Sequence, residues 1–153
     1  MKIDKRITKT FILQKNQSDC GVACLSSIIK FHEGVPNLEK LRIASGTSRQ
    51  GTTLLGLCQV ANSIGFNADG MQADVAFLRE IKQPVILHVI VNGSMLHYVV
   101  CYKVLQNSFL IGDPAVGLKW MDEAELLGIW KSRKLLTLVP DEKRLKKRKL
   151  NTA

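Results

Sequence analysis

Three kinds of signature are missing from this sequence, and each absence argues against a class of protein. No apolar run is long enough to cross a bilayer, since the longest, Val85–Val91, is short and interrupted by His88. The stretch Gly51–Gly56 lacks the Lys-Ser/Thr pair of a phosphate-binding loop. No Cys-x-x-Cys pair is present to build a zinc site. We therefore expect a soluble domain that holds no metal and no cofactor.

The cysteines are few for a disulfide scaffold. Four cysteines would suit two disulfides in a small secreted protein, but the sequence shows no signal peptide. A chain of 153 residues with 46% hydrophobic residues can also build an ordinary core without covalent staples. We expect one main domain with free thiols in a reducing compartment.

Aromatic residues are also scarce, at 6% of the chain, and this bears on its basic charge. The formal net charge is +9, but residues 143–149 (K-R-L-K-K-R-K) carry +6 of it, so the body is only mildly basic. Such a block can bind nucleic acid or anionic lipid. Because it contains no aromatic side chain to stack on bases, we expect no nucleic acid partner.

The stretch Gln14–Ile29 (Q-K-N-Q-S-D-C-G-V-A-C-L-S-S-I-I) places a cysteine at the start of a predicted helix. Asp19 is a favourable N-cap residue, so Cys20 falls at the first helical position. Unpaired N–H groups and the helix dipole favour a thiolate there, and the thiolate is the nucleophilic form. Gly21 has no Cβ, which would let a substrate backbone approach the sulfur. The apolar spacing that follows predicts a buried central helix.

A cysteine in an apolar helix is more often inert than reactive, so a nucleophile needs a base and an orienting group. His97 and Asp113 supply these groups. His97 lies near the start of a predicted strand, and Asp113 lies just past the end of the next one, so antiparallel pairing brings the two into facing positions. Asp113-Pro114 is also a typical turn sequence, and the turn role remains an alternative.

Gln14 precedes Cys20 by six residues. A side-chain amide beside a helix N-terminus can donate a hydrogen bond to a developing oxyanion, together with a backbone N–H. The alternative is a solvated loop residue. We interpret His32, at the end of the central helix, and His88, inside a strand without a nearby partner, as structural residues.

Hydrophobic periodicity places helices early in the chain and strands late, with one strand between helices. We expect helices at residues 20–31, 38–44, 53–64, 75–81 and 123–130, and strands at residues 66–71, 85–91, 96–104, 109–112, 117–121 and 134–139. This order predicts an α+β fold in which N-terminal helices pack on a C-terminal antiparallel β-sheet.

The motifs together resemble one known family. Gln14, the Cys-Gly-x-Ala-Cys-Leu run at Cys20, His97-Tyr-Val-Val and the Asp113-Pro-Ala-x-Gly run occur in the order found in the peptidase domain of bacterial peptidase-containing ABC transporters. These are the double-glycine leader peptidases that process bacteriocins and peptide pheromones. The resemblance spans about residues 8–140.

The resemblance implies a papain-like cysteine peptidase with Cys20 as nucleophile, His97 as base, Asp113 orienting it and Gln14 in the oxyanion hole. It also implies cleavage after a Gly-Gly or Gly-Ala pair that ends a helical leader peptide. The implied partners are that leader peptide and the membrane and ATP-binding domains of a transporter, fused or separate, at the cytoplasmic side of the bacterial membrane.

On this reading residues 1–140 are the peptidase domain. Residues 141–153 are a basic tail or linker toward a transmembrane region that this sequence does not contain. Two other functions stay open. A non-catalytic domain could bind the leader only, although the presence of Cys20, His97 and Asp113 argues against it, and another papain-like activity such as acyl transfer could use the same residues.

Overall fold

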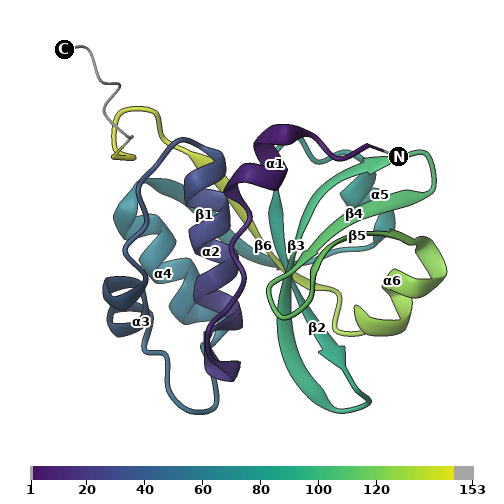
Figure 1. Ribbon diagram of the computed structural model, residues 1–153, viewed down its shortest axis with the longest axis horizontal. Helices are drawn as coiled ribbons and strands as arrows, with labels where there is room; N and C mark the ends of the chain where they lie inside the picture. Colours follow the sequence, from purple (N-terminus) through teal and green to yellow (C-terminus); the bar gives the residue numbers. More distant parts are fainter. Residues whose placement is uncertain (1, 147–153) are drawn as a thin grey trace.

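Figure 1 shows the fold in a computed structural model, which describes residues 2–146. The described strands form one six-stranded sheet in the order β1-β6-β2-β3-β4-β5, and all neighbouring strands run antiparallel. Its strands are β1 (Phe66–Gln72), β2 (Val85–Val91), β3 (Met95–Leu105), β4 (Ser108–Asp113), β5 (Gly117–Asp122) and β6 (Lys134–Pro140). The helices are α1 (Lys5–Thr10), η1 (Gln17–Asp19), α2 (Cys20–Phe31), α3 (Leu38–Ser45), α4 (Leu54–Ile64), α5 (Val75–Arg79) and α6 (Glu123–Ile129).

Helices cover both faces of this sheet, which gives three layers (Figure 1). Side chains along β3 point alternately to the two faces of the sheet, and each face carries its own hydrophobic core. Tyr98 and Val100 belong to the first core, whereas Val99 and Cys101 belong to the second. Helices α1 to α4 pack over the first core, and α5 and α6 cover the second. The predicted α+β class is confirmed, while a second helical layer was not expected from the order of elements.

Helix α2 is the centre of the first layer. Its residues from Cys20 to Ile29 are all buried, and Leu25 and Ile28 are fully enclosed against β3 and the neighbouring helices. The prediction of a buried central helix is therefore confirmed. The short helix α1 was missed because it buries only Ile7 and so carries no apolar periodicity.

Local capping chemistry sets the other helix starts as the sequence predicts. The side chains of Asn37, Asp74 and Asp122 each accept a hydrogen bond from a backbone N–H in the first turn of the helix that follows. None of the helices within residues 2–146 combines the length and apolarity that a membrane span needs.

The segment from Asp141 to Lys146 packs on the domain beyond the predicted boundary at residue 140. Leu145 is only 6% exposed, and the guanidinium of Arg144 donates hydrogen bonds to the carbonyl oxygens of Asn62 at 2.8 Å and Phe66 at 2.9 Å. The first six residues of the expected tail thus contact the folded body. Residues 147–153, which hold the rest of that basic tail, lie outside the described residues.

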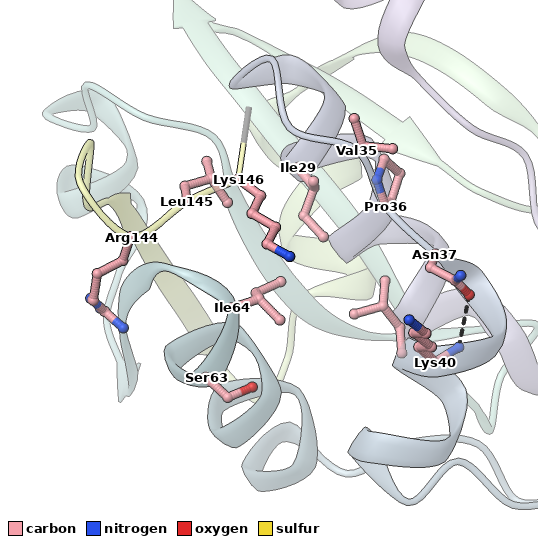
Figure 2. Close-up of a pocket in the computed structure, with 11 residues that line it drawn as sticks. Ile29, Val35, Pro36, Asn37, Lys40, Ser63, Ile64, Arg144, Leu145 and Lys146 are labelled. Atoms are coloured by element: carbon pink, nitrogen blue, oxygen red, sulfur yellow. Dashed lines mark hydrogen bonds between the residues drawn. The ribbon is translucent and has the colours of Figure 1, made fainter. Parts of the chain in front are cut away.

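A cavity of about 390 Å³ opens beside this segment (Figure 2). Its walls combine apolar side chains, among them Ile29, Ile64 and Leu145, with the basic residues Lys40 and Lys146. Ile29 lies near the C-terminal end of α2, whereas Cys20 begins that helix. The cavity therefore lies at the opposite end of α2 from Cys20.

These contacts change what truncation should do. We expect removal of residues 147–153 to leave the melting temperature within about 2 °C, whereas removal of residues 141–153 should lower it by roughly 5–10 °C, because the buried Leu145 and the Arg144 hydrogen bonds are lost. Thermal melts of the two truncated chains followed by circular dichroism make the comparison. Equal melting temperatures would show that the 141–146 segment contributes no stability.

Candidate active site

Cys20 is the first residue of α2 and is 5% exposed. The predicted position at the helix N-terminus is therefore confirmed, with the thiol almost buried. Asp19 occupies the expected N-cap position, but its side chain makes no capping hydrogen bond. A turn of 3-10 helix, η1, leads directly into α2, and Asp19 instead faces Arg42 from α3, with Nε 3.0 Å from Oδ1.

Gly21 lies at a close contact between helix α2 and its neighbours. It is buried, and a Cβ built on it would lie 3.1 Å from Leu57 Cδ1 and 3.2 Å from Tyr98 Cδ2. Gly21 therefore lets α2 pack closely against α4 and β3, because a larger residue would require the Leu57 or Tyr98 side chain to shift by a few tenths of an ångström. The expectation that Gly21 lets a substrate backbone approach the sulfur stays a prediction. This close packing fixes the position of the neighbouring cysteine.

His97 and Asp113 meet as predicted, with His97 Nε2 2.7 Å from Asp113 Oδ1. The two residues lie on adjacent strands, but they are not directly opposite. The last ladder pair is Val100–Gly112, so Asp113 lies level with Val99 and reaches His97 diagonally along one face. The register shifts by one residue between Cys101 and Lys103, which the sequence did not reveal. Without this shift Asp113 would lie level with Val100, so the irregularity brings Asp113 one residue closer to His97.

Burial and hydrogen bonding act in opposite directions on the imidazole. Burial alone lowers the pKa of His97, but hydrogen bonds with Asp113 and Cys20 outweigh it and raise the pKa to about 9. Burial likewise raises the pKa of Asp113, yet the hydrogen bonds from His97 and from the backbone N–H of Ala115 leave that pKa below its usual value. The pair is therefore an imidazolium beside a carboxylate at neutral pH.

Asp113 also fulfils the turn role that the sequence left open. Its Oδ1 accepts a hydrogen bond from the backbone N–H of Ala115 at 2.9 Å, and its carbonyl accepts one from Val116 at 3.0 Å. The two interpretations are compatible, because the turn holds the carboxylate in the position from which it reaches His97.

Gln14 lies beside the same turn. Its backbone N–H donates to the carbonyl oxygen of Pro114 at 2.8 Å, which ties the segment before Cys20 to the residue after Asp113. The side-chain Oε1 is buried and has no hydrogen-bond partner among the described residues. A buried amide end without a partner is uncommon, and rotation of the amide by 180° would present Nε2 at the same place.

The arrangement can perform nucleophilic chemistry. Asp113 occupies Nε2 of His97, which leaves Nδ1 as the ring nitrogen available to the Cys20 thiol. A proton held on this nitrogen can later pass to a leaving group, while the sulfur attacks an electrophilic carbon. The helix N-terminus at Cys20 supplies backbone N–H groups for a developing negative charge.

The remaining histidines and thiols take no part in this arrangement. The expectation that His88 lacks a nearby partner is wrong, because Nδ1 lies 3.4 Å from Ser132 Oγ and the ring packs edge-on against Tyr98. Burial raises the pKa of Cys24, the thiol one turn after Cys20, well above its ordinary value, so it stays protonated. Within residues 2–146, no cluster of three or more His, Cys, Asp or Glu side chains could hold a metal ion.

Two neighbours of the site were missed. Arg42 is too far from Cys20 in sequence for spacing to suggest a contact, and no local pattern pairs it with Asp19. The Tyr98 hydroxyl donates to the carbonyl oxygen of Thr52 at 2.8 Å and fixes the ring that packs on Gly21. Its position directly after His97 was the only available signal.

Residues 8–143 match the peptidase C39 family. The pediocin PA-1 transport/processing ATP-binding protein PedD of Pediococcus acidilactici is 37% identical over 69% of this chain and 15% of its own length. The transport/processing ATP-binding protein ComA of Streptococcus pneumoniae is 36% identical over 78% of this chain and 16% of its own length. The chain thus spans about a sixth of the length of these relatives.

Solved structures agree with this result. The peptidase domain of Streptococcus ComA, described as a bi-functional ABC transporter in a quorum-sensing pathway, superposes with a TM-score of 0.79 at 31% identity, over 85% of this chain and 97% of that one. A double glycine motif protease from an AMS/PCAT transporter, solved with its leader peptide, gives a TM-score of 0.76 at 26% identity over 84% and 89%. The expected papain-like α+β fold is confirmed.

Proposed function

This chain belongs to the peptidase C39 family, and on that premise we propose that it is a cysteine endopeptidase that removes the leader peptide from a bacteriocin or pheromone precursor after a double-glycine motif. The observation that carries the proposal is the 2.7 Å contact between His97 and Asp113, in a site where Cys20 at the start of α2 contributes to the raised pKa of His97. A thiol, an imidazole and a carboxylate in this order form the set that thiol proteolysis requires.

In the proposed reaction the Cys20 thiolate attacks the carbonyl carbon of the scissile peptide bond. The amide of Gln14 and the backbone N–H of Cys20 donate hydrogen bonds to the oxyanion. The protonated His97 then gives its proton to the leaving amine, and a thioester to Cys20 remains. Water, deprotonated by His97, attacks that thioester, which releases the acyl part as a carboxylic acid and returns the Cys20 thiolate beside a protonated His97. Asp113 keeps the imidazole ring oriented and stabilises its charged form.

The proposed substrate and partners follow the names of the relatives. The leader-bound protease favours a leader peptide as the bound segment, and PedD and ComA are transport and processing proteins. We place the domain at the cytoplasmic side of a bacterial membrane, working with the membrane and ATP-binding domains of an exporter, whether fused or separate.

A defined peptide pair tests the function. We expect the purified chain to cleave a synthetic peptide with a helical leader ending in Gly-Gly after the second glycine, and to leave uncut a matched peptide with Val at both positions. Mass spectrometry of the products identifies the bond. Binding of the leader without cleavage would instead indicate a recognition domain, and a product in which an added amine replaces water would indicate acyl transfer.

Gln14 has its own test. We expect Gln14→Ala to lower kcat by about 10²–10³-fold with KM nearly unchanged, because an oxyanion donor acts mainly in the transition state. Gln14→Glu should be at least as damaging, since it places an acceptor where a donor is required. Steady-state kinetics separate the two constants. A rise in KM alone would make Gln14 a substrate-binding residue instead.

A further inference from the structure

A buried carboxylate lies directly before the candidate nucleophile. Asp19 is only 1% exposed and directly precedes Cys20 in the chain, so the Cα atoms of the two residues are about 3.8 Å apart. One carboxylate oxygen, Oδ2, accepts a hydrogen bond from the Asn16 side chain at 3.3 Å. A bare negative charge at this place would oppose the formation of a second negative charge on the thiol.

The other oxygen meets a cation from a different element. Arg42, in the last turn of α3, places Nε 3.0 Å from Asp19 Oδ1, and its Nε–H is not directed at the oxygen, so the contact is an ion pair rather than an aligned hydrogen bond. Arg42 is one-third exposed, whereas Asp19 is enclosed. Helix α3 carries none of the candidate catalytic residues, yet it supplies the charge that balances Asp19.

We propose that Arg42 is a positioning residue of the active site, which neutralises Asp19 and thereby keeps the thiolate of Cys20 favoured. The inference rests on the proposed function, in which Cys20 is the nucleophile. The ion pair also links α3 to the turn η1 from which α2 begins, so a purely structural role of Arg42 is the alternative to be tested.

Arg42 could act through its charge or by holding the backbone, and the two mechanisms predict different activities for the same variants. If Arg42 acts through charge, its loss harms the thiolate only while Asp19 is ionised, and removal of both charges restores the site. If Arg42 acts only by holding the backbone, removal of both partners is at least as harmful as removal of one. A double-mutant cycle therefore distinguishes the two mechanisms.

The test measures Arg42→Gln, Asp19→Asn, the double variant and wild type. Arg49→Gln is the matched control, because Arg49 lies on the exposed 46–51 loop shortly after α3 and its loss also removes one positive charge. Iodoacetamide is added at pH 7, and tandem mass spectrometry locates the alkylated cysteine. Cleavage of the Gly-Gly peptide gives kcat/KM, and circular dichroism shows whether each variant is folded.

We expect Arg42→Gln to slow Cys20 alkylation and to lower kcat/KM by on the order of 10- to 50-fold, because it leaves the buried charge of Asp19 uncompensated. Asp19→Asn should alkylate as fast as wild type or faster, the double variant should recover to within about threefold of wild type, and Arg49→Gln should change neither value. If Arg42→Gln is unfolded at 25 °C, the Asp19→Asn and double variants still decide the matter, since a charge role requires both to remain reactive.

Alkylation of Arg42→Gln at the wild-type rate, or a double variant as slow as Arg42→Gln, would overturn the inference. Cys20→Ala, measured beside them, keeps this failure separate from failure of the proposed function. An inactive Cys20→Ala together with an undisturbed Arg42→Gln rejects only the role of Arg42. A fully active Cys20→Ala rejects the thiol mechanism itself.

Discussion

Cys20→Ala is expected to abolish cleavage of a Gly-Gly leader peptide, with a loss of on the order of 10⁵-fold or more, because no other group can take the place of the nucleophile. The fold should persist, because the substitution removes only one sulfur atom. Although Cys20 is nearly buried, the lost packing should lower the free energy of unfolding by only about 1 kcal/mol. Chromatography of the peptide products and a thermal melt measure the two properties on the same preparation.

Cys24→Ala is the matched control. Cys24 lies one turn later on the same helix and is fully buried, and its raised pKa keeps it a thiol that cannot attack a peptide bond. This variant should cleave within about threefold of wild type, and alkylation of Cys20 should still block it. Residual cleavage by Cys20→Ala above a few per cent, or an inactive but folded Cys24→Ala, would contradict the assignment of the nucleophile.

Much of the fold is predictable because its elements carry local signals. The strands β2 to β6 alternate with turn sequences such as Asn92-Gly93, and their predicted bounds agree with the structure to within one or two residues. The caps at Asn37 and Asp122 mark helix starts by side-chain chemistry alone. The placement of α5 and α6 on the second face is a consequence of tertiary packing, and no local pattern encodes it.

The candidate site likewise has some features that the sequence predicts and others that depend on tertiary packing. The position of Cys20 at a helix start and the contact between His97 and Asp113 follow from residue chemistry and strand order, and both are predicted correctly. The N-cap position of Asp19 is predicted correctly, but its ion pair with Arg42 is not, because Arg42 belongs to an element distant in sequence. Close packing at Gly21 also depends on side chains from two other elements, which spacing cannot reveal.

His97→Ala should be nearly as damaging as loss of the nucleophile, because residues that act as one unit do not contribute additively. Without the imidazole, the thiol loses its base and the leaving amine loses its acid. Asp113→Asn should be milder by about one to two orders of magnitude, since the ring remains and only its orientation and charge are less well held. Steady-state kinetics on the three variants give this ranking, and a His97→Ala variant as active as wild type would remove His97 from the site.

The pH profile separates the part that Asp113 plays from simple structural damage. In the wild type the pKa of His97 is raised to about 9, so kcat/KM should fall as the pH rises through that value and the imidazolium loses its proton. Asp113→Asn removes the partner that raises this pKa and leaves the burial that lowers it. The alkaline limb should therefore move to lower pH, and the variant should lose proportionally more activity at pH 8.5 than at pH 6.5. A uniformly reduced profile with its alkaline limb unmoved would mean that Asp113 only shapes the turn at Pro114, and that another group holds the charge of His97.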